Sequence, residues 1–159
     1  MANRVVVTAE ENITSPIWLD KVESFVLFAM EKLKFDCEEV SILFCNDSYI
    51  KELNKCYRNI DNATDVLSFE NDMEYEDEGT LWKAVGDIVI SVDMIAENAR
   101  YFNTTENAEL KRLLVHGLLH LNGMDHGEEH IEANKAPECE MLVLQESLLK
   151  ELQEKIIIG

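Results

Sequence analysis

Short β-branched runs alternate with longer runs of helical periodicity along this 159-residue chain, and their order restricts the folds that it can adopt. Four runs are rich in Val, Ile and Phe and are typical of strands: 5–8, 40–45, 65–69 and 85–91. In the segments between and after them, apolar residues recur every three or four positions, as on one face of a helix. The expected helices are 16–35, 46–57, 93–102, 105–121 and 137–155.

This order predicts a single α+β domain over residues 1–159, with a small mixed four-stranded sheet packed with about five to six helices. The hydrophobic fraction of 47% is sufficient for a core of this size. Ser15 and Pro16 are expected to begin the first helix. The connection between the third and fourth strands is expected to be irregular and solvated, because six of the nine residues from 70 to 78 are acidic. The last helix is expected to bury one face, made of Met141, Leu144, Leu148 and Leu152.

The composition favours a cytoplasmic protein without a membrane partner. No apolar run approaches the roughly 20 residues that span a bilayer, and the first residues lack a signal-peptide pattern. The cysteines are widely spaced and form no C-x-x-C pair, which indicates reduced, partly buried thiols. The net charge of −18 opposes nucleic-acid binding, because phosphate contacts need a basic surface. The four cysteines are Cys37, Cys45, Cys56 and Cys139.

All four histidines lie in or just after the window HGLLHLNGMDH. His116 and His120 are four residues apart, so in a helix both rings project from one face and can bind one metal ion. Gly123 can end this helix and turn the chain, which brings His126 back towards the pair. Three imidazoles leave a fourth position open for water, as in a catalytic zinc site near a helix C-terminus. His130 is expected to be a solvated loop residue.

The histidine spacing leaves the metal and the reaction class open. Zinc is the first expectation for one divalent ion, although nickel, copper, cobalt and iron also accept imidazole. The same spacing fits the zinc-protease pattern H-E-x-x-H-x-x-G-x-x-H, in which the residue after the first His is a Glu that acts as general base. That residue is Gly117 here and has no proton acceptor, so a metalloprotease would lack its base.

Three cations follow one stripe of the expected helix 46–57 and its end. Lys51, Lys55 and Arg58 stand at i, i+4 and i+7, and the neighbouring stripe is apolar. The cations are candidates for substrate binding through phosphate, and the alternative is an ordinary solvated face. The planar guanidinium of Arg58 suits phosphate oxygens best. The neighbouring apolar stripe is expected to consist of Leu53, Cys56 and Tyr57.

Four blocks of the sequence resemble one known family. HGLLHLNGMDH resembles the motif of the YbeY-type endoribonucleases, which are rRNA maturation factors. LNKCYR (53–58), TDVLSF (64–69) and GDIVIS (86–91) are similar to further family blocks in the same order. The segments 70–79 and 127–140 depart from the family pattern. The resemblance implies a small mixed sheet packed with helices, with metal ligands His116, His120 and His126 and the family's arginine at Arg58.

The resemblance also implies an activity. The expected function is a single-strand-specific, metal-dependent endoribonuclease in 16S rRNA 3′-end maturation and ribosome quality control. Its expected partners are ribosomal RNA and the small ribosomal subunit or a ribosome-associated protein. The expected catalytic residues are Arg58, which would hold the phosphate, and His116, which would hold the metal. An alternative, favoured by the net charge of −18, is a ribosome-associated assembly factor whose metal is mainly structural.

The general base is left open. Asp125, Asp65 and Asp87 are candidates to accept the proton of the attacking water. Each has a structural alternative, as a carboxylate behind a metal ligand or as a hydrogen-bond acceptor at the end of a strand.

Overall fold

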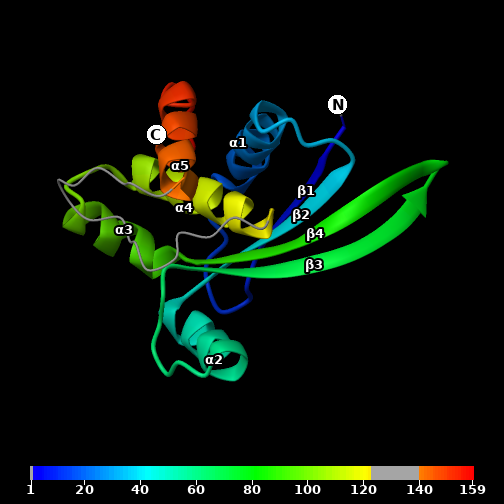
Figure 1. The fold of residues 1–159 in the computed structure, drawn as a ribbon. Coiled ribbons are helices and arrows are strands. Elements are labelled where there is room, and N and C mark those ends of the chain that lie inside the picture. Colours follow the sequence, from blue (N-terminus) through cyan, green and yellow to red (C-terminus); the bar gives the residue numbers. More distant parts are fainter. Residues whose placement is uncertain (1, 123–139) are drawn as a thin grey trace.

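The computed structural model describes residues 2–122 and 140–159, and it confirms the α+β class (Figure 1). In these ranges four strands and five helices follow one another in the predicted order. The strands are β1 (Arg4–Ala9), β2 (Glu38–Cys45), β3 (Val66–Asp77) and β4 (Thr80–Ser91). The helices are α1 (Leu19–Lys32), α2 (Asp47–Arg58), α3 (Val92–Tyr101), α4 (Glu106–Leu121) and α5 (Glu140–Glu151).

The strands form one mixed sheet in the order β1-β2-β4-β3. β1, β2 and β4 are parallel, and β3 pairs antiparallel with β4 at the edge. Parallel neighbours need long crossover connections, which explains why α1 lies between β1 and β2 in the chain. The central β4 carries Ile88 opposite Ile42 of β2 and Val89 opposite Leu67 of β3, so it is apolar on both faces.

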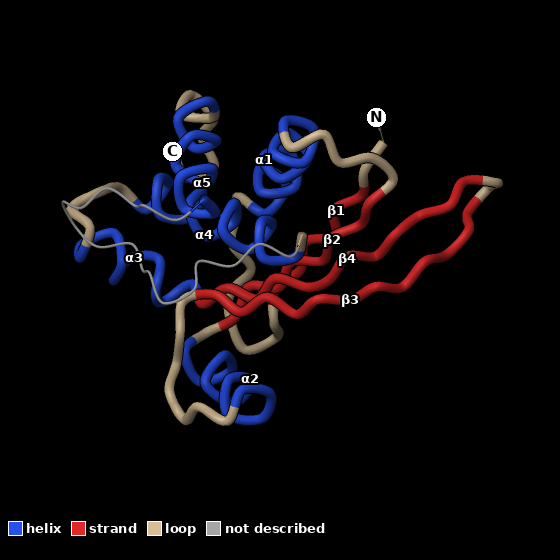
Figure 2. The backbone as a smooth tube through the Cα atoms, in the orientation of Figure 1, coloured by secondary structure: helices blue, strands red, loops and turns tan. Residues whose placement is uncertain are grey.

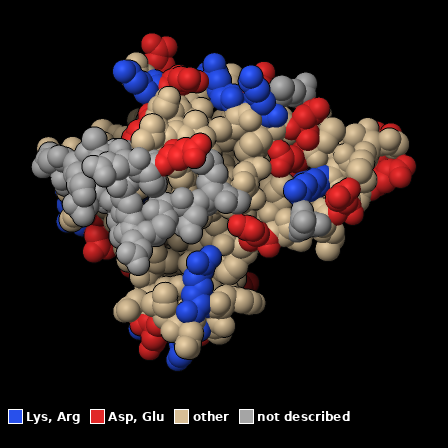
Figure 3. All heavy atoms as spheres, in the orientation of Figure 1, with Lys and Arg blue, Asp and Glu red and all other residues tan. Residues whose placement is uncertain are grey.

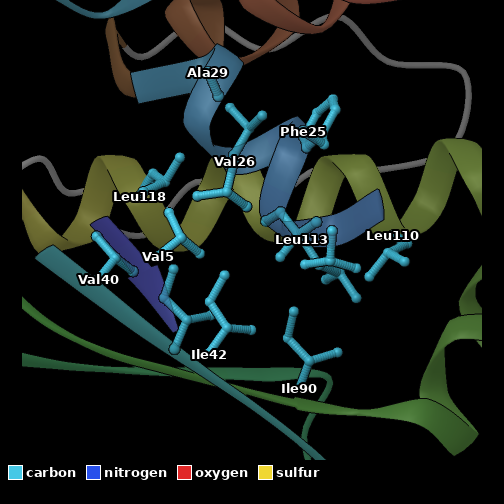
Figure 4. Close-up of a cluster of buried hydrophobic side chains, with 14 of the residues drawn as sticks. Val5, Phe25, Val26, Ala29, Val40, Ile42, Ile90, Leu110, Leu113 and Leu118 are labelled. Atoms are coloured by element: carbon cyan, nitrogen blue, oxygen red, sulfur yellow. The ribbon is translucent and has the colours of Figure 1, made fainter. Parts of the chain in front are cut away.

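Helices cover the two faces of the sheet unequally. α1 and α4 lie across one face and α2 lies on the other (Figure 1). Figure 4 shows the larger core, in which side chains from α1 and α4 meet those of the strands. Figure 4 labels ten of its buried residues: Val5, Phe25, Val26, Ala29, Val40, Ile42, Ile90, Leu110, Leu113 and Leu118.

The prediction that residues 70–78 form an irregular connection is wrong. They continue β3 as far as Asp77, and with β4 they form a long two-stranded arm that extends beyond β1 and β2 (Figure 2). A two-residue turn joins the strands, because Glu78 and Gly79 both adopt positive φ, at 50° and 82°. Acidic residues alternate here with Met73 and Tyr75, a period of two that fits a strand better than a loop.

Long-range contacts hold the arm against the rest of the sheet. The guanidinium of Arg4, on β1, lies 3.9 Å from the ring centroid of Trp82. It also donates hydrogen bonds to the Tyr75 hydroxyl at 3.1 Å and to Asp77 at 2.7 Å. The Tyr75 hydroxyl in turn donates to Glu39 of β2 at 3.1 Å. These partners are more than 30 residues apart in the chain, so no local sequence pattern could predict them.

The first helix begins later than predicted. Trp18 is the N-cap of α1, and the predicted start at Ser15 and Pro16 is wrong. The Trp18 ring packs edge-on against Phe44 of β2, with ring centroids 5.1 Å apart. This contact fixes against the sheet the residue that precedes the first helical turn.

The described cysteines, Cys37, Cys45 and Cys56, are free, and Cys139 lies outside the described residues. Cys45 is buried in the sheet, and burial raises the pKa of its thiol to about 12. Cys56, by contrast, is exposed.

None of the helices in the described ranges combines the length and apolar character needed to cross a bilayer.

Gly86 of β4 stands where α4 ends above the sheet. Its φ of +149° lies in a region that side chains rarely adopt. A Cβ atom there would collide with the backbone oxygen of Phe69 and lie 2.6 Å from Cδ2 of Leu121. The glycine therefore allows β3, β4 and the last turn of α4 to meet.

We expect Gly86→Ala to lower the free energy of unfolding by roughly 2–5 kcal/mol, because it adds backbone strain to a collision. Gly79→Ala is the matched control, since Gly79 also has positive φ but has no atom within 4 Å of its Cβ position. It should lose only about 1–2 kcal/mol. Urea unfolding followed by circular dichroism measures both variants. Equal losses would show that the close approach at Gly86 is unimportant.

Candidate functional site

The last two turns of α4 carry His116 and His120, both half-buried. The helix begins at Thr105, whose Oγ1 accepts a hydrogen bond from a first-turn N–H at 3.1 Å. It ends at Asn122, whose Nδ2 donates to a carbonyl of the preceding turn at 3.1 Å. The predicted helix and its capping residue are confirmed, and both histidines stand on regular backbone.

The two imidazoles converge. Nε2 of His116 and Nε2 of His120 lie 3.1 Å apart, and the rings meet edge-on with centroids 4.6 Å apart. Two nitrogens this close need a proton or a metal ion between them, because two bare lone pairs repel. In a tetrahedral zinc site with Zn–N bonds of roughly 2.0–2.1 Å, two ligand nitrogens lie about 3.3 Å apart. The pair thus fits two of the positions around such an ion.

The predicted third ligand, His126, lies outside the described residues, as do Gly123, Asp125 and His130. Within residues 2–122 and 140–159, no group of three or more His, Cys, Asp or Glu side chains could hold a metal ion. The three-histidine centre and its zinc therefore stay predictions. The described geometry concerns only two of the predicted ligands, His116 and His120.

Gly117 has a packing role between the histidines. A Cβ atom at this position would lie 2.9 Å from both Cδ1 and Cγ2 of Ile88, so the glycine lets α4 approach β4 closely. This is the position at which zinc proteases carry their glutamate base. A glutamate here would have to displace Ile88 from the core. The packing therefore agrees with the sequence argument against a protease.

The cationic stripe lies on α2, on the other face of the sheet. Lys51, Lys55 and Arg58 are all exposed, and Lys and Arg side chains project from this lower part of the molecule in Figure 3. Asn46 caps the helix, with its Oδ1 accepting the Tyr49 N–H at 2.8 Å. The helix extends to Arg58, one residue further than predicted, so all three cations stand on the same element.

Arg58 lies beside an open hollow on the edge of the sheet. The hollow has a volume of about 460 Å³ and is lined by Tyr57, Arg58, Ser68, Phe69 and Glu70. Nη2 of Arg58 donates to the backbone oxygen of Ser68 at 2.9 Å, and the guanidinium lies 5.9 Å from the Phe69 ring centroid. Tyr57 packs edge-on against Phe69, with ring centroids 5.4 Å apart. Guanidinium donors and two aromatic rings thus share one surface.

The neighbouring apolar stripe of α2 is not a buried face, because Leu53 is half-buried and Cys56 and Tyr57 are exposed. The helix is instead buried through Ile50 and Asn54. Nδ2 of Asn54 donates to the backbone oxygen of Asn62 at 2.9 Å. The connection to β3 therefore folds back over this asparagine.

The histidine-bearing end of α4 and the side chain of Arg58 reach the same stretch of β3. Arg58 binds the backbone of Ser68. The next residue, Phe69, contacts Gly86 through its backbone oxygen, and Leu121 at the end of α4 packs on the same glycine. Since β3 is the edge strand, the two groups flank one edge of the sheet from its two faces.

Asp65, a candidate base, is held in a network of hydrogen bonds. Its Oδ1 accepts the Val66 N–H at 2.8 Å, its Oδ2 accepts from Asn98 at 2.9 Å, and Arg112 lies 3.6 Å away. Arg112 also donates twice to the buried Glu109, at 2.8 and 2.6 Å. Burial alone would lower the pKa of Arg112, but the bonds to Glu109 raise it overall. The network favours the structural alternative for Asp65.

Asp87 lies on the wrong face for a base at the histidines. Side chains alternate along a strand, and the neighbouring Ile88 points at Gly117 of α4. Asp87 must therefore point to the opposite face, where α2 lies. Its side chain is exposed, and the neighbouring protein atoms that desolvate it in part raise the pKa of its carboxyl.

A contact that the sequence did not predict joins α5 to the site. Oε1 of Gln145 lies 2.7 Å from Nδ1 of His116. Gln145 is completely buried, whereas Leu144, predicted on the buried face of α5, is 37% exposed, so that prediction is wrong. The sequence carries one signal for the burial of Gln145, which is its spacing from apolar residues at intervals of four, three and four positions, as on one helix face. The buried residues at this spacing are Met141, Gln145, Leu148 and Leu152.

A family model described as Endoribonuclease YbeY matches residues 6–153, which include the histidine pair and the cationic helix. The chain belongs to the YbeY family. The resemblance seen in the four sequence blocks is thereby confirmed.

Individual YbeY proteins match over almost their whole length. Endoribonuclease YbeY of Treponema denticola is 47% identical over 150 residues, covering 94% of this chain and 93% of its own. Endoribonuclease YbeY of Aquifex aeolicus is 38% identical over 142 residues, covering 89% and 90%. A solution structure of a Thermotoga maritima protein is similar with a TM-score of 0.59 and 28% identity, covering 93% of this chain and 88% of that one.

Proposed function

We propose that this member of the YbeY family is a metal-dependent endoribonuclease specific for single strands. The observation that carries the proposal is the convergence of His116 and His120, whose Nε2 atoms lie 3.1 Å apart. Membership in a family whose members are named endoribonucleases supports RNA as the substrate.

His116, His120 and His126 would hold one divalent ion, with zinc the first candidate and nickel or another transition metal the alternatives. When bound, such an ion supplies Lewis-acid chemistry, polarising a phosphoryl oxygen and activating water. His116 acts in catalysis by keeping its Nε2 directed at this centre. The base that receives the proton stays unassigned, because Asp125 lies outside the described residues and the contacts of Asp65 and Asp87 favour other roles.

Arg58 would hold the phosphate beside the edge strand. One of its five N–H donors binds Ser68, which fixes the guanidinium and leaves further donors for phosphate oxygens. Lys51 and Lys55 extend this positive surface along α2 and would bind neighbouring phosphates without reading sequence.

The exposed ring of Tyr57 supports single-strand specificity. It is 70% exposed and stands next to Arg58 and Phe69. Unpaired bases can stack on aromatic rings, whereas bases inside a duplex present no free face.

We further propose that ribosomal RNA, at the 16S 3′ end, is the substrate and that the small ribosomal subunit or a protein on it is the partner. The net charge of −18 repels free RNA, so a protein contact is needed to bring this enzyme to its site.

The first test is cleavage of an end-labelled single-stranded RNA by metal-loaded protein beside His120→Ala purified in parallel. We expect the wild type to cleave and the variant to lose roughly 100-fold or more of this activity together with its metal, because a ligand is gone. A chelator should stop the wild type, and the same sequence as a duplex should resist it. Equal cleavage by both proteins would refute the proposal, since it would indicate a contaminating nuclease.

The second test separates phosphate binding from metal binding. We expect Arg58→Ala to reduce cleavage by roughly 100- to 1000-fold, as the loss of one positioned donor does, with metal content unchanged. Arg100→Ala, at an exposed arginine of α3, is the matched control and should retain full activity. Loss of metal from Arg58→Ala would show that the arginine is structural.

The third test decides between an enzyme and an assembly factor with a mainly structural metal. We expect both the wild type and His120→Ala to co-sediment with small ribosomal subunits, because the acidic surface rather than the metal would mediate binding. Only the wild type should restore 3′-end maturation in cells that lack the protein. If His120→Ala restores maturation as well, the catalytic proposal is wrong.

A further inference from the structure

Gln145 is a fully buried amide in a helix face that is otherwise apolar. Its neighbours in the buried 4-3-4 pattern of α5, Met141 and Leu148, both contribute to the main core. Among the residues that the structure describes, its Nε2 has no partner in good hydrogen-bond geometry, although the amide is close enough to the Glu146 carboxyl to oppose the rise in pKa that burial causes there. A buried donor without a partner costs stability, so packing alone would favour Leu or Met at this position. The contact that offsets this cost is the one between Oε1 and His116.

That contact determines where His116 carries its proton. A carbonyl oxygen can only accept, so Nδ1 must donate to Oε1 across the 2.7 Å contact. In a neutral imidazole the proton on Nδ1 leaves the lone pair on Nε2. This is the atom that lies 3.1 Å from Nε2 of His120. The opposite amide orientation would place the proton on Nε2 and block it as a metal ligand.

The position of Gln145 relative to α4 is itself fixed by a second contact between the helices. Lys111, a buried residue of α4, donates from Nζ to the backbone oxygens of Leu152 at 2.7 Å and of Lys155 at 2.8 Å. These oxygens lie at and beyond the C-terminal end of α5, where carbonyls lack helical partners. α4 therefore holds α5 at its end, and the Gln145 side chain meets His116 at a set height along α4.

We propose that Gln145 is a positioning residue that keeps Nε2 of His116 unprotonated and directed at the metal centre. The inference rests on the proposed function, in which His116 is a ligand. Groups behind metal-bound histidines orient the ring and select its tautomer, and their loss weakens metal binding roughly 10- to 100-fold. An uncharged amide performs this task without adding negative charge beside Glu146, whose carboxyl already interacts with that of Glu109.

The test compares three variants by zinc affinity, measured in competition with a chromogenic chelator, and by the tautomer of His116, measured by long-range proton–nitrogen NMR in zinc-free protein. Gln145→Leu removes the acceptor, and we expect zinc affinity to fall roughly 10- to 100-fold with loss of the Nδ1–H preference. Gln145→Glu keeps an acceptor and should stay within about tenfold of wild type. Leu148→Ala, a buried control on the same helix, should lower stability and leave zinc affinity unchanged.

Wild-type affinity in Gln145→Leu would overturn the inference, and so would an equal loss in Leu148→Ala. If Gln145→Leu does not fold, the decision falls to Gln145→Glu and to the wild-type tautomer. A proton on Nε2 of His116, or a loss well beyond tenfold in Gln145→Glu, overturns the inference. Wild type that binds no zinc or other divalent metal refutes both the metal centre and this role. Wild type that binds metal but cuts no RNA refutes the proposed function alone.

Discussion

Gly117 brings α4 so close to the sheet that a single added carbon would lie 2.9 Å from Ile88, and the rest of the molecule is arranged around this contact. α4 is buried on most sides, against the strands and the neighbouring helices, and carries the two histidines on a half-buried stripe. Two charged residues of the same helix reach other segments. Lys111 holds the end of α5, and Arg112 ties the residue before β3 into the network with Glu109. One closely packed helix thus positions every described part of the histidine site.

Electrostatics constrains the protein as strongly as packing does. Its net charge is −18, yet the proposed reaction needs it to hold a polyanion. The structure separates most of the acidic residues from the cations, although Glu70 lines the hollow beside Arg58. Acidic residues alternate with apolar ones along the β3 strand of the arm, whereas Lys51, Lys55 and Arg58 line one stripe of α2. Contacts with phosphate are therefore local, and long-range attraction of RNA is weak.

Predictions from the sequence succeeded where the physical cause is local. The order of strands and helices follows from hydrophobic period, and the helix that carries the histidines follows from its apolar spacing and from Thr105 as its cap. The convergence of His116 and His120 needs only the 3.6-residue turn of a helix. The prediction failed for residues 70–78, because their acidic composition indicated a solvated loop, whereas their period of two is typical of a strand and distant residues, Arg4 and Glu39, hold the segment in the sheet.

By itself, the sequence determined the α+β class, the helix that presents the histidine pair and the cationic stripe, because each depends on residues within a few positions of one another. Tertiary structure decided which polar side chains are buried and which surfaces meet. Gln145 faces His116 across 29 residues of chain, and Arg58 reaches Ser68 only because the connection between them folds back over Asn54. Such contacts depend on how helices and strands pack together. The residues that meet in this way do not recur at a regular spacing along the chain, so the sequence pattern alone does not predict them.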